Sequence, residues 1–130
     1  MANLIPHLLI LDNDPTFART ISRLLAENGY QTTTLSTGDG LLEYLATQAV
    51  DLLLLDLALP GQDGFSILEM LRRNPAHREL PVLALTDQTI EDTSVRALGL
   101  GASDVIAKPV RARELLARIR VHLRTGHALH

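Results

Sequence analysis

Five short apolar runs alternate with longer segments of helical periodicity, and this alternation constrains the fold more than any other feature of the chain. The runs cover residues 7–11, 30–35, 51–55, 81–85 and 104–107. The helical segments cover residues 15–27, 38–47, 64–73, 89–98 and 111–124. A β-α unit repeated five times predicts one parallel sheet with helices on both faces and right-handed crossovers.

Local signals refine this prediction. The runs at 7–11, 51–55 and 81–85 are apolar on both faces, as strands of a covered parallel sheet are. The run at 30–35 is more polar and β-branched, which favours an edge strand. Asp14 followed by Pro15 predicts the start of a helix, with an N-cap and a proline at the first helical position. Residues 125–130 lose the periodicity, so we expect a domain over 1–124 followed by a tail or the start of a linker.

Composition excludes several classes of protein. The chain has 130 residues, of which 46% are hydrophobic, and this fits one compact domain. It has no cysteine, which removes disulfides, zinc-thiolate sites and cysteine nucleophiles. A net charge of −3 and a pI near 5.9 have the wrong sign for nucleic-acid phosphates, so we expect no direct binding of nucleic acid. No apolar run approaches the ~18 residues of a membrane span. We therefore expect a cytoplasmic domain without a membrane partner.

The residues that terminate the runs carry the chemistry. The first run ends at Asp12, the third at Asp56, the fourth at Thr86 and the fifth at Lys108. Ligands of open α/β sheets bind outside the carboxyl ends of the strands. Neighbouring carboxylates repel each other unless a cation is present, and hard oxygen ligands favour Mg²⁺. Because a carboxylate can also attack phosphorus, the pattern predicts phosphoryl capture, most simply by Asp56.

Four segments together resemble a known family. They are residues 8–14 (LLILDND), 51–64 (DLLLLD followed by LPGQDG), 81–86 (PVLALT) and 101–109 (GASDVIAKP). In this order the chain resembles, over essentially its full length, the receiver domain of bacterial two-component response regulators. The resemblance implies an α/β fold, namely a flavodoxin-like (βα)5 three-layer sandwich. Its central five-stranded parallel sheet would have the strand order 2-1-3-4-5.

The resemblance also implies roles for single residues. Asp56 matches the phosphoacceptor, which takes its phosphoryl group from a histidine kinase or a phosphotransfer protein. Asp12 matches the first member of the acidic pair near Mg²⁺ (or Mn²⁺). Thr86 and Lys108 match the pair that contacts phosphate. The bond before Pro109 is typically cis in the family, and X-Pro is the one bond type for which cis costs little.

The metal and switch positions depart from the family pattern. Asn13 stands where the second acid, a metal ligand, is usual, so we expect weaker Mg²⁺ binding; Ala58 matches the position whose backbone carbonyl ligates the metal. Val105 replaces the aromatic ring that moves inward when Thr86 contacts phosphate, so only the threonine half of the switch remains. Asp87 stands where small residues are common, and it is expected to slow phosphorylation or shorten the phosphoryl lifetime.

A further charged set resembles the residues that pair across two-fold dimers of receivers attached to winged-helix DNA-binding domains. The set comprises Arg96, Asp104, Glu114 and Arg118. Such dimers use the fourth helix, the fifth strand and the fifth helix. A homodimer through this face is therefore a possible assembly, with ion pairs that specify geometry more than strength.

The expected function is signalling rather than enzymatic turnover. The domain would promote its own phosphorylation and dephosphorylation, and the added charge would switch its surface to control an output. The alternative is a pseudo-receiver, an interaction module that signals without phosphorylation. An aspartate-nucleophile phosphatase would need an acid at Ala58. A flavin-binding module would need a phosphate-cradling loop after the first strand, where Asp12 and Asp14 would repel the phosphate.

Overall fold

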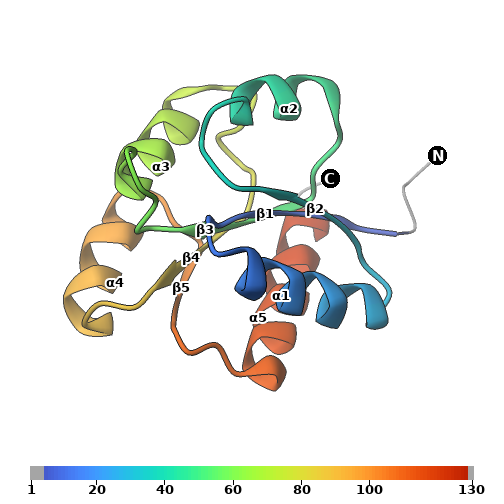
Figure 1. Cartoon of the computed structure of the whole chain (residues 1–130). Coiled ribbons are helices and arrows are strands. Elements are labelled where there is room, and N and C mark those ends of the chain that lie inside the picture. Colours follow the sequence, from blue (N-terminus) through green and yellow to red (C-terminus); the bar gives the residue numbers. More distant parts are fainter. Residues whose placement is uncertain (1–4, 129–130) are drawn as a thin grey trace.

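The computed structural model describes residues 5–128, which form five strands and five helices in alternation (Figure 1). The strands are β1 (His7–Leu11), β2 (Gln31–Leu35), β3 (Leu52–Asp56), β4 (Val82–Thr86) and β5 (Asp104–Ala107). The helices are α1 (Pro15–Glu27), α2 (Leu41–Thr47), α3 (Gly64–Arg73), α4 (Ile90–Gly99) and α5 (Ala112–Ala128). All neighbouring strands are parallel, in the order β2-β1-β3-β4-β5, which confirms the predicted fold class.

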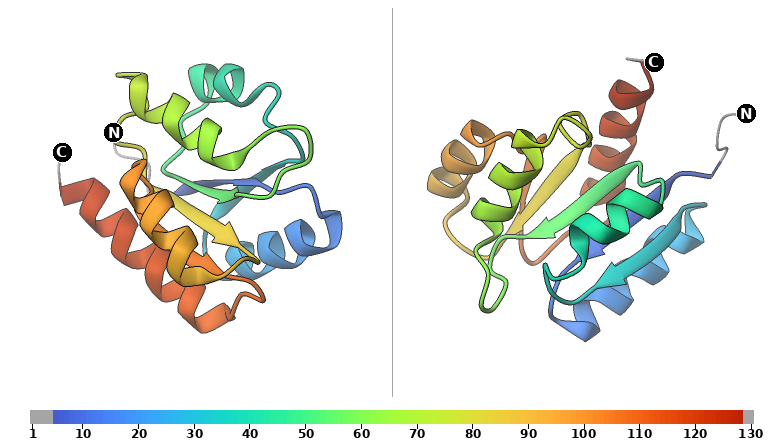
Figure 2. Two further views of the ribbon diagram at one scale, coloured as in Figure 1. Left: turned by 90° about the vertical axis from the view of Figure 1, so that its left-hand side faces the viewer. Right: turned by 90° about the horizontal axis from the view of Figure 1, so that it is seen from above.

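Two layers of helices cover the sheet, as the three-layer prediction requires (Figure 2). Successive side chains of a strand point to opposite faces, so Leu9 and Leu11 pack with the layer of α2, α3 and α4. Leu8 and Ile10 pack with α1 and α5 on the other face. Every residue of β1, β3 and β4 is buried. Burial of each such leucine stabilises the fold by about 1.5–3 kcal/mol, so the three central strands form a rigid base for the residues that follow them.

The local signals also hold. β2 lies at the edge of the sheet, and its five residues are all at least partly accessible. The Asp14 side chain accepts hydrogen bonds from the backbone N–H groups of Thr16 and Phe17, and Pro15 is the first residue of α1. Asp14 is thus the predicted N-cap. Its hydrogen bonds fix how the first turn of α1 leaves the end of β1.

Two helix boundaries differ from the expectation by more than one residue. α2 begins at Leu41 rather than at residue 38, and Gly40 before it has a φ of 80°, outside the helical region. α5 continues to Ala128, so the expected non-helical tail is helical as far as that residue. Apolar periodicity ends near Arg124, but helix propagation requires only backbone hydrogen bonds, and no proline interrupts them there. Across residues 5–128, none of the helices combines the length and apolarity needed to cross a bilayer.

Candidate functional site

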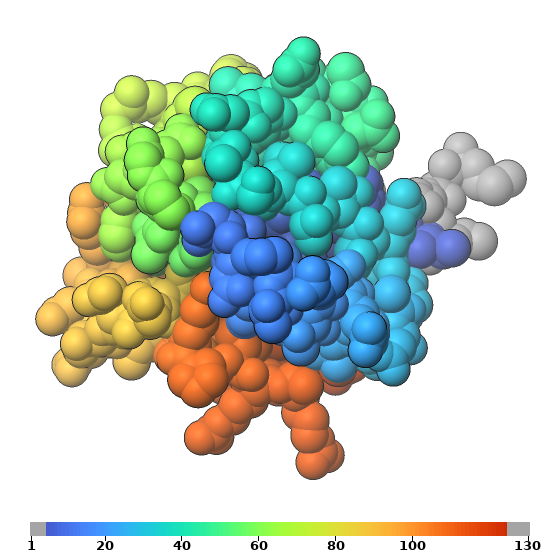
Figure 3. All heavy atoms as spheres, viewed as in Figure 1, coloured from blue at the N-terminus to red at the C-terminus, as the bar shows by residue number. Residues whose placement is uncertain are grey.

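The register of the sheet brings the four predicted strand-end residues to one edge. Leu11 pairs with Leu55, so Asp12 and Asp56 follow at the same level on neighbouring strands. Thr86 pairs with Ala107, the residue before Lys108. The segments that follow β1, β3, β4 and β5 meet on one face of the molecule, where the blue, green, yellow and orange regions converge in Figure 3.

The ammonium of Lys108 lies between two buried carboxylates. Its Nζ donates a hydrogen bond to Oδ2 of Asp12 at 2.8 Å and lies 3.7 Å from Oδ2 of Asp56. The Asp12 side chain is fully buried, whereas the side chains of Asp56 and Lys108 are 7% and 21% exposed. One cation therefore faces two anions, and the cluster keeps one uncompensated negative charge in a poorly hydrated place.

This environment acts directly on Asp56. Burial raises the pKa of its carboxyl above the ordinary value of 3.8, and the charges of Asp12 and Asp87 act in the same direction. The backbone N–H of Ala58, which donates to Asp56 Oδ1 at 3.0 Å, and the charge of Lys108 oppose the rise without cancelling it. The Asp56 carboxylate is thus held in an orientation by one hydrogen bond while its charge is only partly compensated.

Thr86 contributes a buried hydroxyl beside this cluster. Its side chain is at the end of β4, and the residue is 2% exposed. The hydroxyl oxygen accepts a hydrogen bond from the backbone N–H of Gln88 at 3.0 Å, which leaves its own O–H proton available to a ligand. The Thr86 carbonyl accepts from the backbone N–H of Lys108 at 2.7 Å, and the Lys108–Pro109 bond is cis, as predicted.

The two other residues expected at the metal site follow Asp12 and Asp56 in the chain. Asn13 and Ala58 are both exposed next to Asp12 and Asp56. Within residues 5–128 no group of three or more His, Cys, Asp or Glu side chains could hold a metal ion. Of residues 12, 13 and 56, only Asp12 and Asp56 are carboxylates. Two carboxylates with a surplus negative charge are hard oxygen donors of the kind that Mg²⁺ prefers, and Asn13 and Ala58 add an amide and a backbone carbonyl next to them in the chain.

Val105 and Asp87 lie in contrasting environments. Val105 is 9% exposed and packs in the core cluster beneath α3 and α4, so it is a core residue of β5. Asp87 is exposed, and its charge helps to raise the pKa of Asp56. The expectation that Asp87 acts on the phosphoacceptor position therefore has a physical basis in this electrostatic interaction.

The predicted dimer-face set is only partly assembled within one chain. Arg118 donates two hydrogen bonds to Asp104, at 2.9 and 3.1 Å, and lies 4.0 Å from Glu114. Arg96 does not join them. Its guanidinium lies 3.9 Å from the centroid of the Phe65 ring and 3.8 Å from an oxygen of Asp63, both on the α3 side.

Three contacts were missed by reasoning from the sequence. His122 shares Asp104 with Arg118, with its Nε2 3.0 Å from Asp104 Oδ2. Gly64 has no room for a side chain, because a Cβ would lie 2.5 Å from the Cα of Leu57, directly after Asp56. Phe17 places its ring under the ammonium of Lys108, 4.3 Å from centroid to Nζ. A sequence signal for Phe17 exists, since it is one of four aromatics and stands in the first turn after Asp12.

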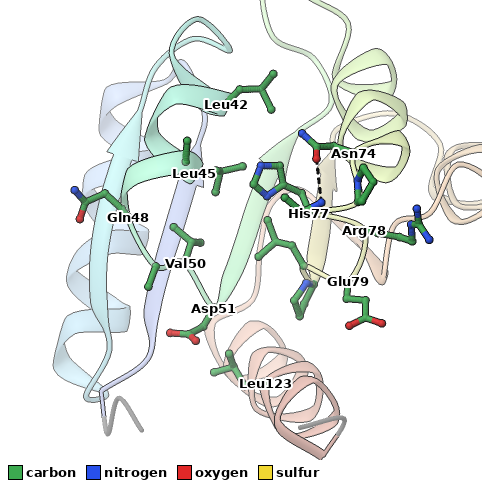
Figure 4. A pocket seen from close by; sticks show the side chains of 16 residues that line it. Leu42, Leu45, Gln48, Val50, Asp51, Asn74, His77, Arg78, Glu79 and Leu123 are labelled. Carbon is green, nitrogen blue, oxygen red and sulfur yellow. Dashed lines mark hydrogen bonds between the residues drawn. The ribbon is translucent and has the colours of Figure 1, made fainter. Parts of the chain in front are cut away.

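A groove of about 1100 Å³ lies elsewhere, at the amino-terminal edge of the sheet (Figure 4). Leu42 and Leu45 of α2 line one wall and the loop from Asn74 to Pro81 lines the other. None of the four strand-end residues borders it. This groove is therefore separate from the cluster of charged groups, and the chemistry assigned to the cluster does not depend on it.

The amino-acid sequence of this chain is similar to those of known proteins. The family model of the response regulator receiver domain matches residues 8–120. The transcriptional regulatory protein DltR of Streptococcus agalactiae is 42% identical over 117 residues, which are 90% of this chain and 51% of DltR. The transcriptional regulatory protein HprR of Escherichia coli is 43% identical over 125 residues, 95% of this chain and 53% of HprR. The chain thus spans about half the length of these relatives.

Solved structures agree with the sequence relatives. A CheY-like response regulator receiver domain protein from Methanospirillum hungatei superimposes with a TM-score of 0.88 at 25% identity, covering 97% of this chain and 99% of that protein. The likeness therefore extends over the whole sheet and all five helices described above.

Proposed function

The chain belongs to the response regulator receiver domain family, and on this premise we propose that it accepts a phosphoryl group on Asp56 from a histidine kinase or a phosphotransfer protein. Receiver domains act in two-component signalling and generally use Mg²⁺. The observation that carries the proposal is the placement of Lys108 Nζ between Asp12 and Asp56 at the carboxyl edge of the sheet. A nucleophile, an acidic neighbour and a cation thereby surround one small space.

The proposed transfer uses one oxygen of the Asp56 carboxylate as the nucleophile. A bond forms from this oxygen to phosphorus while the bond from phosphorus to the donor imidazole nitrogen breaks, and the imidazole leaves with that electron pair. The Lys108 ammonium, 3.7 Å from Asp56 Oδ2, and the Thr86 hydroxyl, at the end of the neighbouring strand, would donate hydrogen bonds to the phosphoryl oxygens. Hydrolysis later replaces the aspartyl oxygen on phosphorus with water, which releases phosphate and restores the carboxylate.

The divalent cation would be held by Asp12, Asp56, the backbone carbonyl of Ala58 and the side-chain carbonyl of Asn13. When bound, Mg²⁺ would neutralise charge on the phosphoryl oxygens. The surplus negative charge around Lys108 supports this assignment, because a second cation would compensate it. Asn13 supplies an oxygen without charge, which supports weaker binding than a third carboxylate would give.

The proposed switch begins at Thr86. Phosphorylation adds about 1.5 to 2 negative charges at the sheet edge. A move of the Thr86 hydroxyl toward these charges would break its hydrogen bond with the N–H of Gln88 and shift the loop before α4. Because Val105 is a small core residue and not an aromatic ring, only the loop would carry the change to the surface.

The proposed output is assembly of two copies through α4, β5 and α5. We place this protein in the cytoplasm. The matched relatives are transcriptional regulators, so we propose that any DNA binding belongs to an attached domain rather than to this one. Exposed Val95 and Leu98 on α4 and Val121 on α5 give this face an apolar component. Light scattering with and without beryllofluoride tests the assembly: a dimer that forms with the phosphoryl mimic supports it, and a monomer in both states at high concentration refutes it.

Phosphorylation itself is tested by intact-protein mass spectrometry after incubation with a small phosphodonor and Mg²⁺. We expect one added phosphoryl group on the wild type and none on Asp56→Asn. Asp14→Asn is the matched control, because asparagine caps a helix as well as aspartate does and the acid stands in the same loop. Absence of the added mass from the wild type would refute the proposal and favour the pseudo-receiver.

A further inference from the structure

We propose that Phe17 is a positioning residue for Lys108. The contact between the Phe17 ring and the Lys108 ammonium, called the seat below, holds the ammonium beside Asp56 and does not neutralise the ammonium charge. The role in phosphoryl transfer rests on the function proposed above, whereas the seat itself does not. The inference begins with the position of Nζ, which lies 4.3 Å from the centroid of the Phe17 ring. A cation this close to a ring face is attracted by the quadrupole of the ring.

The seat matters because Lys108 has no substitute. It is the only lysine in the chain, and no arginine is among the charges that act on Asp56. A lysine stem has four rotatable carbons, so the ammonium needs contacts that restrict it. Asp12 supplies one such contact at 2.8 Å, and the Phe17 ring supplies another from the α1 side.

A ring and a carboxylate differ in their effect on the charge of the Lys108 ammonium. An ammonium has three N–H donors, and a carboxylate partner takes one of them and offsets the charge. An aromatic face attracts the cation without adding a negative charge. A third carboxylate in place of Phe17 would have fixed Lys108 equally well, but it would have added negative charge where phosphoryl oxygens arrive. Phe17 therefore orients the ammonium and preserves its attraction for an anion.

The sequence around Phe17 fixes the ring in this place. Asp14 caps α1 by accepting from the N–H of Phe17 at 3.3 Å, and Pro15 fixes the backbone of the first turn. The Phe17 side chain is half-buried and packs against the core cluster shared by α1 and α5. The ring is thus held by the fold itself, so its contact with Lys108 costs little additional ordering.

The chain contains a matched control. Its second phenylalanine, Phe65, also carries a cation on its face, the guanidinium of Arg96 at 3.9 Å. Both phenylalanines are half-buried near a helix start, but Arg96 is not among the charges that act on Asp56. Phe65→Leu therefore reproduces the loss of ring and packing without touching Lys108.

The first experiment observes the seat directly in the protein without metal or phosphodonor. With ¹³C-labelled lysine, the side chain of Lys108 gives a single set of signals, because there is no other lysine. We expect ring-current shifts of its Hε protons in the wild type and in Phe17→Tyr, and loss of these shifts in Phe17→Leu. Phe65→Leu should keep them. Hε shifts that are the same in Phe17→Leu as in the wild type would overturn the seat.

The second experiment measures the rate of acyl-phosphate formation from a small phosphodonor at saturating Mg²⁺. We expect Phe17→Leu to be slower by about 2- to 30-fold, the range of a cation–π contact, with the rate restored in Phe17→Tyr. Phe65→Leu should react at the wild-type rate. Equal rates for Phe17→Leu and the wild type, or equal slowing by both leucine variants, would overturn the positioning role. A wild type that is never phosphorylated would refute the proposed function and this role together, while the proton shifts would still decide the seat.

Discussion

Lys108 Nζ lies 2.8 Å from Oδ2 of Asp12, and this ion pair joins the end of β5 to the end of β1 across the carboxyl edge of the sheet. The Asp12 side chain is completely buried, and Lys108 is the cation that contacts it at 2.8 Å. The pair therefore stabilises the metal-free protein and also stands where a divalent cation would compete for the same carboxylate.

Replacement of Lys108 by methionine tests this dual role. The variant keeps the apolar stem but leaves two buried carboxylates without a cation, so we expect the free energy of unfolding without Mg²⁺ to fall by about 2 kcal/mol, the cost of leaving a buried polar group without its partner. Urea denaturation measures it, and Mg²⁺ should restore more stability to the variant than to the wild type. Arg113→Met removes an exposed cation and serves as the control. An equal response of Lys108→Met and the wild type to Mg²⁺ would contradict competition for Asp12.

The exposed Asn13 side chain gives a second prediction. Asn13→Asp adds a charged oxygen next to Asp12, so we expect Mg²⁺ to bind about tenfold more tightly, as ligand charge raises the affinity of such sites. Titration calorimetry at constant ionic strength measures the change. Asp39→Asn, at an exposed acid before α2, should leave the affinity unchanged. An unaltered affinity of Asn13→Asp would place residue 13 outside the metal shell.

Asp87 gives a third prediction, because its charge acts on Asp56. Asp87→Ala removes a negative charge from the approach to the phosphoacceptor, and we expect several-fold faster phosphorylation or a longer phosphoryl lifetime. Time-resolved mass spectrometry gives both rates. Asp92→Ala, an exposed acid in the first turn of α4, is the comparison variant. If both rates of Asp87→Ala matched the wild type, Asp87 would have no part in the reaction.

The site's four central residues could be predicted from the sequence, and the reason is geometric. Parallel strands end at one edge, so each strand terminus places its next residue in the same region. Asp12, Asp56, Thr86 and Lys108 needed only correct strand ends to be brought together. Asp14 as the N-cap of α1 was predictable for a similar reason, because capping depends on residues close in the chain.

The remaining contacts depend on how helices rotate and pack, which a local pattern does not specify. The ring of Phe17 meets Lys108 because α1 packs beside β2 and its first turn lies next to the segment that follows β5. Arg96 was expected among the dimer-face charges, yet it lies over Phe65 on α3. His122 stood three turns along α5 from its start, and only the packing of α5 on β5 brings it to Asp104.

The cluster at Asp104 predicts a pH dependence of stability. Burial works to raise the pKa of Asp104, but hydrogen bonds from Arg118, His122 and the N–H of Val105 outweigh it and hold the pKa below the ordinary 3.8. A depressed carboxyl pKa stabilises the fold above the unfolded value, and this stability is lost as the pH falls through the folded value. We expect Asp104→Asn to cost about 1 kcal/mol at neutral pH and progressively less below pH ~4.

Denaturation at a series of pH values measures this difference. Asp39→Asn again serves as the exposed control and should follow the wild-type curve. A constant difference between Asp104→Asn and the wild type from neutral pH down to the acid transition would show that the carboxylate charge does not contribute.

Identification of the modified residue tests the central claim most directly. Borohydride reduction of the phosphorylated protein converts an aspartyl phosphate to homoserine, and peptide mass spectrometry then locates it. We predict homoserine at position 56 alone, formed only when Mg²⁺ and phosphodonor are both present. Homoserine at Asp12 or Asp14 instead, or unchanged phosphorylation of Asp56→Asn, would contradict the assignment of Asp56 as the phosphoacceptor.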